Sequence, residues 1–201
     1  MKVRVTFMEE ALGSTPAKED LLRDYIAKKA PDAEKTEEEV AARGVDAVVD
    51  DRMTIFPKLA DGTPFFWDYQ VKGFFKDSWK MLVKAGKAGY TGGKACAGVK
   101  AFVKAIDGLI FVSPRQIPIN MNGCLMGTCE RPLRANTPMG ERVSIAKSET
   151  VPEGSTIEFE IKCLDPALED AVVECLDYGA LRGLSQWRNS GKGRFTWERI
   201  D

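Results

Sequence analysis

Residues 155–200 read STIEFEIKCLDPALEDAVVECLDYGALRGLSQWRNSGKGRFTWERI, and their pattern of secondary-structure signals is the clearest in the chain. Over 155–163 apolar residues alternate with polar ones, which predicts a half-buried strand. Asp165 and Pro166 suit the N-cap and first position of a helix, which we predict over 166–182. A glycine-rich basic loop over 183–195 then enters a last strand, RFTWERI. This part of the chain therefore predicts a strand, a helix, a loop and a strand in succession.

The remaining elements follow from the same kinds of pattern, upstream of this stretch. The longest is a helix over 69–85, where Phe75, Trp79 and Leu82 recur at helical spacing. The others are strands at 2–7, 53–57, 107–119 and 142–150, helices at 16–30, 36–43 and near 96–106, and a hairpin or loop at 121–127. Strands and helices mix without strict alternation, which favours an α+β fold with helices on one face of a mainly antiparallel sheet. A chain of 201 residues suits one domain.

The composition excludes several classes of mechanism. The chain has no histidine, which excludes Ser-His-Asp triads, Cys-His dyads and histidine-ligated zinc. Its five cysteines are best interpreted as free thiols, and Cys124 and Cys129 lack the partners of a zinc site, so we predict no metal and no cofactor. The first residues lack the apolar region of a signal peptide, and no apolar run is long enough to span a membrane. We therefore expect a cytoplasmic protein with no membrane partner.

A net charge of −1 hides a strong asymmetry along the chain. Residues 9–51 carry 13 acids and 6 bases, whereas residues 71–104 carry 8 lysines and a single acid, Asp77. A stripe of four lysines on the predicted helix, each four residues from the next, comprises Lys72, Lys76, Lys80 and Lys84. Such a stripe is mildly self-repelling, and phosphates along a nucleic-acid strand would relieve it. A solvated helix face, or pairing with the acidic segment, is the other interpretation.

The C-terminal loop is a second basic region. Arg182, Arg188, Lys192 and Arg194 lie in it or at its start, with no acid among residues 182–194. Its glycines would let the backbone approach a ligand closely, and Trp187 offers a face on which a base could stack. The loop has no Walker pattern, and a plain turn between helix and strand is the alternative.

Three segments together resemble the RAMP superfamily, specifically the guide-RNA-binding backbone subunits of type III CRISPR effector complexes. In DGTPFFWDYQVKGFFKDSWKML (61–82), Lys72-Gly73 stands where the family has a Lys-Gly signature opening a helix, and Lys76 where it has a second basic residue. SETVPEGSTIEFEIKC (148–163) is similar to the family's entry to a strand, and LRGLSQWRNSGKGRFTWERI (181–200) to its C-terminal glycine-rich loop and strand.

The resemblance implies one RAMP-like domain over 1–201, with a ferredoxin-like (RRM-like) sheet. It also implies an insertion after the first strand, here the acidic stretch at about 8–52, expected to be helical. A guide or single-stranded RNA would lie along a basic groove, with other CRISPR effector subunits or copies of the chain as further partners in antiviral defence. The residues expected to bind RNA are Lys72, Gly73, Lys76, Lys80, Trp187, Arg188, Lys192, Gly193 and Arg194.

The chain also departs from the family. Tyr69-Gln70 replaces a pair of small residues, and Trp187 and Asn189 are bulkier than usual in the loop. Cleaving members of the family use an Asp after the first strand together with a divalent metal. Asp46, Asp50 and Asp51 are candidates here, but no motif selects one of them, so we assign no catalytic residue. Enzymatic activity is therefore the least supported function. Without histidine, we expect no metal-independent RNA cleavage. Two other interpretations stay open: a prophage-borne RAMP-like inhibitor of a CRISPR complex, and a single-strand binding or annealing protein.

Overall fold

The strand predicted over 155–163 is the centre of the larger of two sheets. The computed structural model describes residues 1–17, 53–137 and 140–201. β10 (Thr156–Cys163) pairs with β1 (Lys2–Phe7) on one side and with β6 (Ile110–Ser113) and β7 (Gln116–Asn120) on the other. β11 (Phe195–Arg199) lies beyond β1, and β5 (Phe65–Trp67) beyond β7. All these pairs are antiparallel, so the mainly antiparallel sheet expected from the sequence is confirmed.

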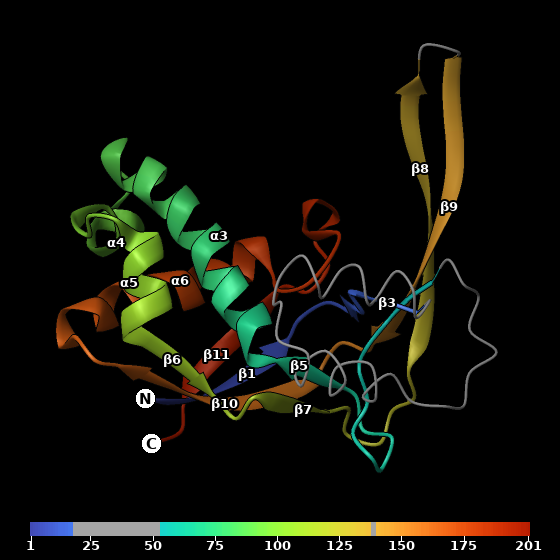
Figure 1. The fold of residues 1–201 in the computed structure, drawn as a ribbon, viewed down its shortest axis with the longest axis horizontal. Coiled ribbons are helices and arrows are strands. Elements are labelled where there is room, and N and C mark those ends of the chain that lie inside the picture. Colours follow the sequence, from blue (N-terminus) through green and yellow to red (C-terminus); the bar gives the residue numbers. More distant parts are fainter. Residues whose placement is uncertain (18–52, 138–139) are drawn as a thin grey trace.

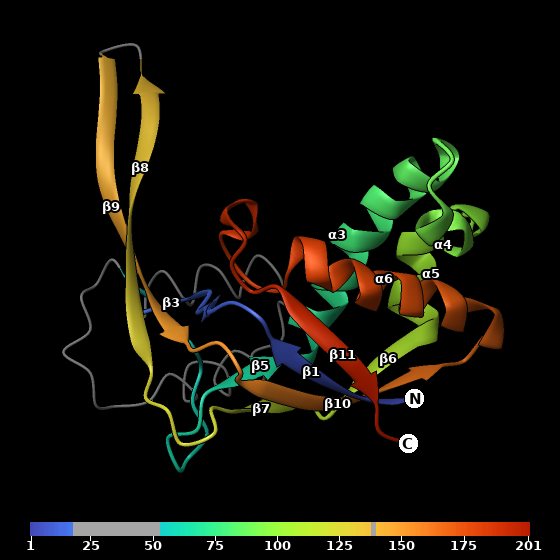
Figure 2. The ribbon, with the colours of Figure 1, turned by 180° about the vertical axis from the view of Figure 1, so that it is seen from behind.

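Helices cover one face of this sheet, as expected. The described ranges contain four α-helices: α3 (Asp68–Lys87), α4 (Lys94–Gly98), α5 (Phe102–Leu109) and α6 (Glu169–Arg182). In both views α3, α5 and α6 lie on the same side of the strands (Figures 1 and 2). Short 3₁₀ turns complete the helical layer at η1 (Thr91–Gly93), η2 (Pro166–Leu168) and η3 (Arg188–Ser190). The α+β class is therefore confirmed.

The core lies between the sheet and these helices, because alternate strand residues face it. Val3, Val5 and Phe7 of β1 are buried there, as are Ile157, Phe159 and Ile161 of β10. The helices contribute the opposite wall of the core: Val71, Phe74, Phe75, Trp79 and Leu82 from α3, and Ala171, Val172, Cys175 and Leu176 from α6. The apolar residues that recur at helical spacing in the sequence thus form the buried face of α3.

Local sequence also explains where the two long helices begin. In α3 the side chain of Gln70 accepts a hydrogen bond from the backbone N–H of Trp67 at 2.8 Å, which satisfies a donor at the helix start. Before α6, the Asp165 side chain accepts from the backbone N–H of Ala167 at 3.0 Å, as its predicted capping role requires. Close packing of α6 on β11 depends on Gly179, since a Cβ there would lie 2.1 Å from the ring of Phe195.

A second sheet was not expected from the sequence. It contains β2 (Ala11–Leu12), β3 (Thr15–Pro16), β4 (Met53–Ile55), β8 (Gly127–Thr137) and β9 (Gly140–Val151). β8 and β9 form a long antiparallel hairpin that projects away from the helices and the larger sheet (Figures 1 and 2). The strand predicted at 142–150 belongs to it, but β8 was missed. Its sequence, GTCERPLRANT, has Gly, Pro and Asn and no alternation, so pairing with β9 decides its structure.

Three other expectations change. The helix predicted from Pro16 does not begin there, because Thr15 and Pro16 form β3 and pair with β4. The helix expected near 96–106 is two helices, α4 and α5, and the strand expected at 107–119 is divided into β6 and β7. The rest of the predicted insertion, 18–52, lies outside the described residues, and so do Asp46, Asp50 and Asp51.

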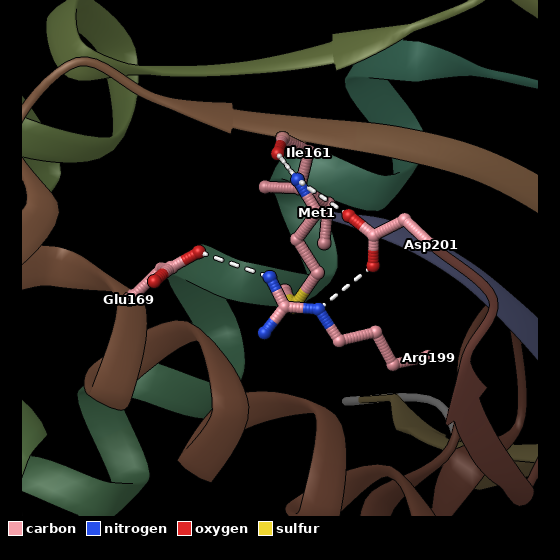
Figure 3. A network of polar contacts seen from close by, with 5 residues as sticks. All are labelled: Met1, Ile161, Glu169, Arg199 and Asp201. Atoms are coloured by element: carbon pink, nitrogen blue, oxygen red, sulfur yellow. Dashed lines mark hydrogen bonds and ion pairs between the residues drawn. The ribbon is translucent and has the colours of Figure 1, made fainter.

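Polar contacts at one end of the larger sheet tie the two ends of the chain together (Figure 3). The amino group of Met1 donates to the carbonyl of Ile161 at 3.0 Å and lies 3.7 Å from the carboxylate of Asp201. The Arg199 guanidinium donates to Asp201 at 2.7 Å and lies 3.5 Å from Glu169. The hydrogen bond from Arg199 lowers the pKa of Asp201, so this carboxylate keeps its charge to a lower pH than an ordinary aspartate. In the described ranges, no helix has both the length and the apolar character needed to cross a bilayer.

Candidate nucleic-acid interface

The first two lysines of the predicted stripe lie against α5 and β6. The ammonium group of Lys76 forms an ion pair with Asp107 at 2.5 Å. Lys72 donates to the backbone carbonyl of Asp107 at 3.4 Å, and its ammonium lies 5.1 Å from the centre of the Phe111 ring. Both side chains therefore lean toward one flank of α3, and Asp107 offsets part of their charge.

The exposed surface of the segment from α3 to α5 carries positive charge without such an offset. Six lysines from α3 to α5 are exposed and have no ion-pair partner among the described residues: Lys80, Lys84, Lys87, Lys94, Lys100 and Lys104. Gly73 lies on the same exposed side of α3, and a Cβ added to it would meet nothing within 4 Å. Packing does not explain a glycine there, although glycine inside a helix costs roughly 0.5–1 kcal/mol relative to alanine. A ligand backbone that approaches α3 closely would explain it.

The cations of the C-terminal loop lie on the other flank of α3. Arg188 and Arg182 both donate to the carboxylate of Asp77, at 2.7 and 3.0 Å. Successive helix residues are about 100° apart around the axis, so Lys76 and Asp77 point to different sides of α3. Lys80 and Gly73 fall between them on the helix surface. Five of the predicted residues therefore lie in one broad band across the exposed face of α3: Lys72, Gly73, Lys76, Lys80 and Arg188.

Lys192 and Arg194 complete the loop. Lys192 is hydrogen-bonded to Glu10 at 2.5 Å, and this bond raises the pKa of the lysine. Arg194 is exposed and has no ion-pair partner in the part of the chain that the structure describes. Of the three predicted cations in the loop, Arg188 and Lys192 are paired with acids, and Arg194 has no described carboxylate as a partner.

The loop glycines have structural roles that the sequence did not reveal. Gly183 and Gly193 have φ angles of +76° and +71°, and a Cβ on Gly193 would lie 1.9 Å from the carbonyl oxygen of Leu184. The loop is closed here, since Leu184 N–H donates to Gly193 and Gly193 N–H donates to Glu10, at 2.8 and 2.9 Å. The N–H of Gly193 is therefore already bound within the protein and does not point to a ligand.

Trp187 meets a residue that the sequence analysis missed. It has a left-handed backbone, with φ of +52°, and its side chain is 38% exposed. The guanidinium of Arg131, from β8, lies 5.0 Å from the centre of its ring. Because β8 was not predicted, no signal in the sequence placed Arg131 beside this loop.

The opposite face of the larger sheet offers a less suitable surface for a polyanion. Arg4 lies there between Glu158 and Glu198, hydrogen-bonded to them at 2.8 and 2.9 Å. Those carboxylates neutralise the arginine and add negative charge beside it. The excess of positive charge is on the helical side of the molecule.

The described ranges provide no candidate metal centre. They contain no group of three or more Cys, Asp or Glu side chains placed to hold a metal ion. Cys96 and Cys175 are buried with their sulfur atoms 3.8 Å apart, while Cys124 is exposed on its own. The hydrogen bond with Cys175, together with burial, raises the pKa of Cys96 and keeps it a neutral thiol.

Comparison with known proteins shows the fold. The sequence matches no model of a protein family and no curated protein. The structure is similar to a chain in the cryo-EM structure of the Type III-B Cmr-beta bound to cognate target RNA. The TM-score is 0.53 and the identity 14%, and the match covers 100% of this chain and 58% of that chain. This chain therefore shares a fold with a chain of that assembly.

Proposed function

We propose that the protein binds single-stranded RNA along the band formed by α3 and the C-terminal loop, as a RAMP-like subunit of a CRISPR effector complex. The observation that carries this proposal is the set of exposed lysines from α3 to α5 that have no ion-pair partner among the described residues. A charge excess on one surface is the electrostatic footprint of a protein that binds a polyanion. The similarity to a chain from a Cmr-beta bound to target RNA supports RNA as that polyanion.

The strand order supports a ferredoxin-like sheet in a single domain. β1, α3, β6, β10, α6 and β11 follow one another in the β-α-β-β-α-β order. Their spatial order, β11-β1-β10 with β6 next to β10, is what such a motif produces. In this proposal the hairpin and the stretch after β1 are additions to that motif, and the band of lysines lies on its helical side.

The proposal gives RNA binding a steep dependence on salt. Each phosphate neutralised on a single strand contributes about −0.7 to the slope of log affinity against log salt. If each of these six exposed lysines meets one phosphate, the slope is roughly −4. Raising salt fourfold would then weaken binding by about two orders of magnitude.

A pair of lysine substitutions tests this surface. We expect Lys80→Gln with Lys84→Gln to lower the slope by roughly 1.4 units and to weaken binding to all RNA sequences alike, because phosphate contacts carry no sequence information. The measurement is a salt titration of fluorescence anisotropy with a short labelled RNA.

Lys2→Gln with Lys162→Gln is the matched control, since both lysines are exposed on the strands of the opposite side. Equal slopes for the two double variants would contradict the proposed surface. Equal affinity of the wild type for DNA and RNA strands would favour the annealing interpretation, and no binding to either would favour the inhibitor.

A second substitution is expected to act in the opposite direction. Asp77→Asn removes the carboxylate that holds Arg182 and Arg188, so both guanidiniums become available to phosphates. We expect tighter RNA binding with a salt slope steeper by about 1.4, since each of the two arginines can then meet a phosphate, and a stability loss of about 1 kcal/mol from the weakened, part-exposed ion pairs. Anisotropy and urea unfolding measure the two effects; weaker binding would place these arginines outside the interface.

A further inference from the structure

A buried guanidinium lies where the hairpin meets the C-terminal loop. Arg131 of β8 is only 9% exposed. Its Nη2 donates to the side chain of Gln186 at 3.0 Å, and its guanidinium lies over the ring of Trp187. Two segments far apart in the sequence therefore meet around this one charge.

The charge of Arg131 is not compensated within the described residues. Its Nε and Nη1 are buried and have no hydrogen-bond partner, and it forms no ion pair with a described carboxylate. The nearest cations of the loop differ in this respect, because Arg188 is held by Asp77 and Lys192 by Glu10. Buried charges in proteins are almost always paired and hydrogen-bonded. An anion other than the described carboxylates would supply what this guanidinium lacks.

Trp187 beside it is held in a strained and exposed position. Its left-handed backbone is unusual for a bulky residue, and such strain concentrates at functional sites. The residues before it are fixed to the second sheet: Ser185 donates to the carbonyl of Leu12, and Gln186 to that of Gly13. The chain thus presents an indole to solvent from a closed, anchored loop.

We propose that Arg131 and Trp187 form a subsite for one nucleotide of a bound single strand, which rests on the proposed function above. A phosphate oxygen accepts hydrogen bonds from the Arg131 guanidinium, whose donors suit phosphate. The base stacks on Trp187, as unpaired bases do on aromatic side chains. Because Nε and Nη1 are covered in the free protein, the indole shifts from the guanidinium onto the base when the strand binds.

Two variants separate the two parts of the subsite. Arg131→Gln removes one phosphate contact, so we expect the salt slope to fall by about 0.7. Trp187→Leu removes stacking and lowers affinity without changing the slope. A short oligouridylate and an abasic strand of the same length are the probes: the Trp187→Leu loss appears only with bases present, while the Arg131→Gln loss appears with both.

Intrinsic fluorescence reports the movement of the indole directly. Trp67 and Trp79 are buried, and Trp197 is bonded to Asp177, so oligouridylate is expected to quench mainly Trp187. Quenching should disappear in Trp187→Phe and persist in Trp197→Phe. We also expect Arg131→Gln to unfold at the same temperature as the wild type or a higher one, because the uncompensated charge is gone. A purely structural arginine would instead lower that temperature.

The outcomes distinguish this inference from the proposed function. If the wild type binds RNA and the Lys80/Lys84 variant is weakened, the proposed surface stands. Wild-type affinity and slope in Arg131→Gln, or unquenched Trp187 in the bound wild type, then overturn the subsite alone. If the wild type binds no strand, the proposed function fails first.

Discussion

Trp79→Ala is expected to produce the largest loss of stability, about 3–5 kcal/mol. Trp79 is completely buried on α3, and its ring stacks on that of Phe102 with centroids 6.3 Å apart. Its indole N–H donates to the backbone carbonyl of Cys96 at 3.1 Å. The residue therefore joins α3 to both α4 and α5, and its removal leaves a cavity and an unpaired carbonyl at the centre of the helical layer.

Urea unfolding followed by circular dichroism measures this loss. Trp79→Phe keeps much of the volume but removes the hydrogen bond, so we expect about 1–3 kcal/mol. Trp197→Ala is the control, since Trp197 is only half-buried and its N–H bonds to the exposed Asp177. If Trp79→Ala costs no more than Trp197→Ala, Trp79 does not hold the helices together.

The elements predicted correctly are those whose signals are local. β10 shows clean alternation, and Asp165 caps the 3₁₀ turn η2 that leads into α6, so neither depends on a distant partner to be recognised. α3 has a buried stripe strong enough to fix its extent within a few residues. Where the short-range sequence pattern and the long-range packing favour the same structure, the sequence alone is sufficient to predict the element.

The second sheet shows where local pattern is not enough. β8 contains Gly127, Pro132 and Asn136, which all disfavour strands, yet it pairs with β9 along its full length. Pro16 suits the first turn of a helix but lies in β3, paired with Thr54. In both cases backbone pairing with a distant segment overrides the preference of the residues themselves.

The candidate site divides in the same way. The excess of lysine over 71–104 is visible in the composition, and exposed positions from α3 to α5 carry most of it. Folding brings Asp107 to Lys76 and Glu10 to Lys192, and the sequence does not show these two ion pairs. Arg131 could not be predicted as a site residue, because its place beside Trp187 depends on β8, a strand that the sequence pattern does not predict.

Gly193→Ala is expected to open the C-terminal loop, with a cost that has two parts. A left-handed φ of +71° costs an alanine about 1–2 kcal/mol. The added Cβ would also lie 1.9 Å from the carbonyl oxygen of Leu184, and relieving such overpacking costs about 1–3 kcal/mol. The contact is with backbone, so no side-chain rotation can relieve it. The loop must separate from Leu184 and Glu10, and Trp187 and Arg188 then lose their positions.

Gly191→Ala is the control that separates the effect of opening the loop from the effect of replacing a glycine that has a positive φ. Gly191 also has a positive φ, +88°, but a Cβ there would only touch the flexible side chain of Arg194, at 3.5 Å. We expect it to cost only the backbone part, about 1–2 kcal/mol, with RNA binding retained. Hydrogen exchange at the amide of Leu184, which donates to Gly193, reports the closure directly. If only Gly193→Ala shows fast exchange and weakened RNA binding, the closed loop is what positions Trp187 and Arg188. If the two variants behave alike, glycine is needed at 193 for its backbone angle and not for closure of the loop.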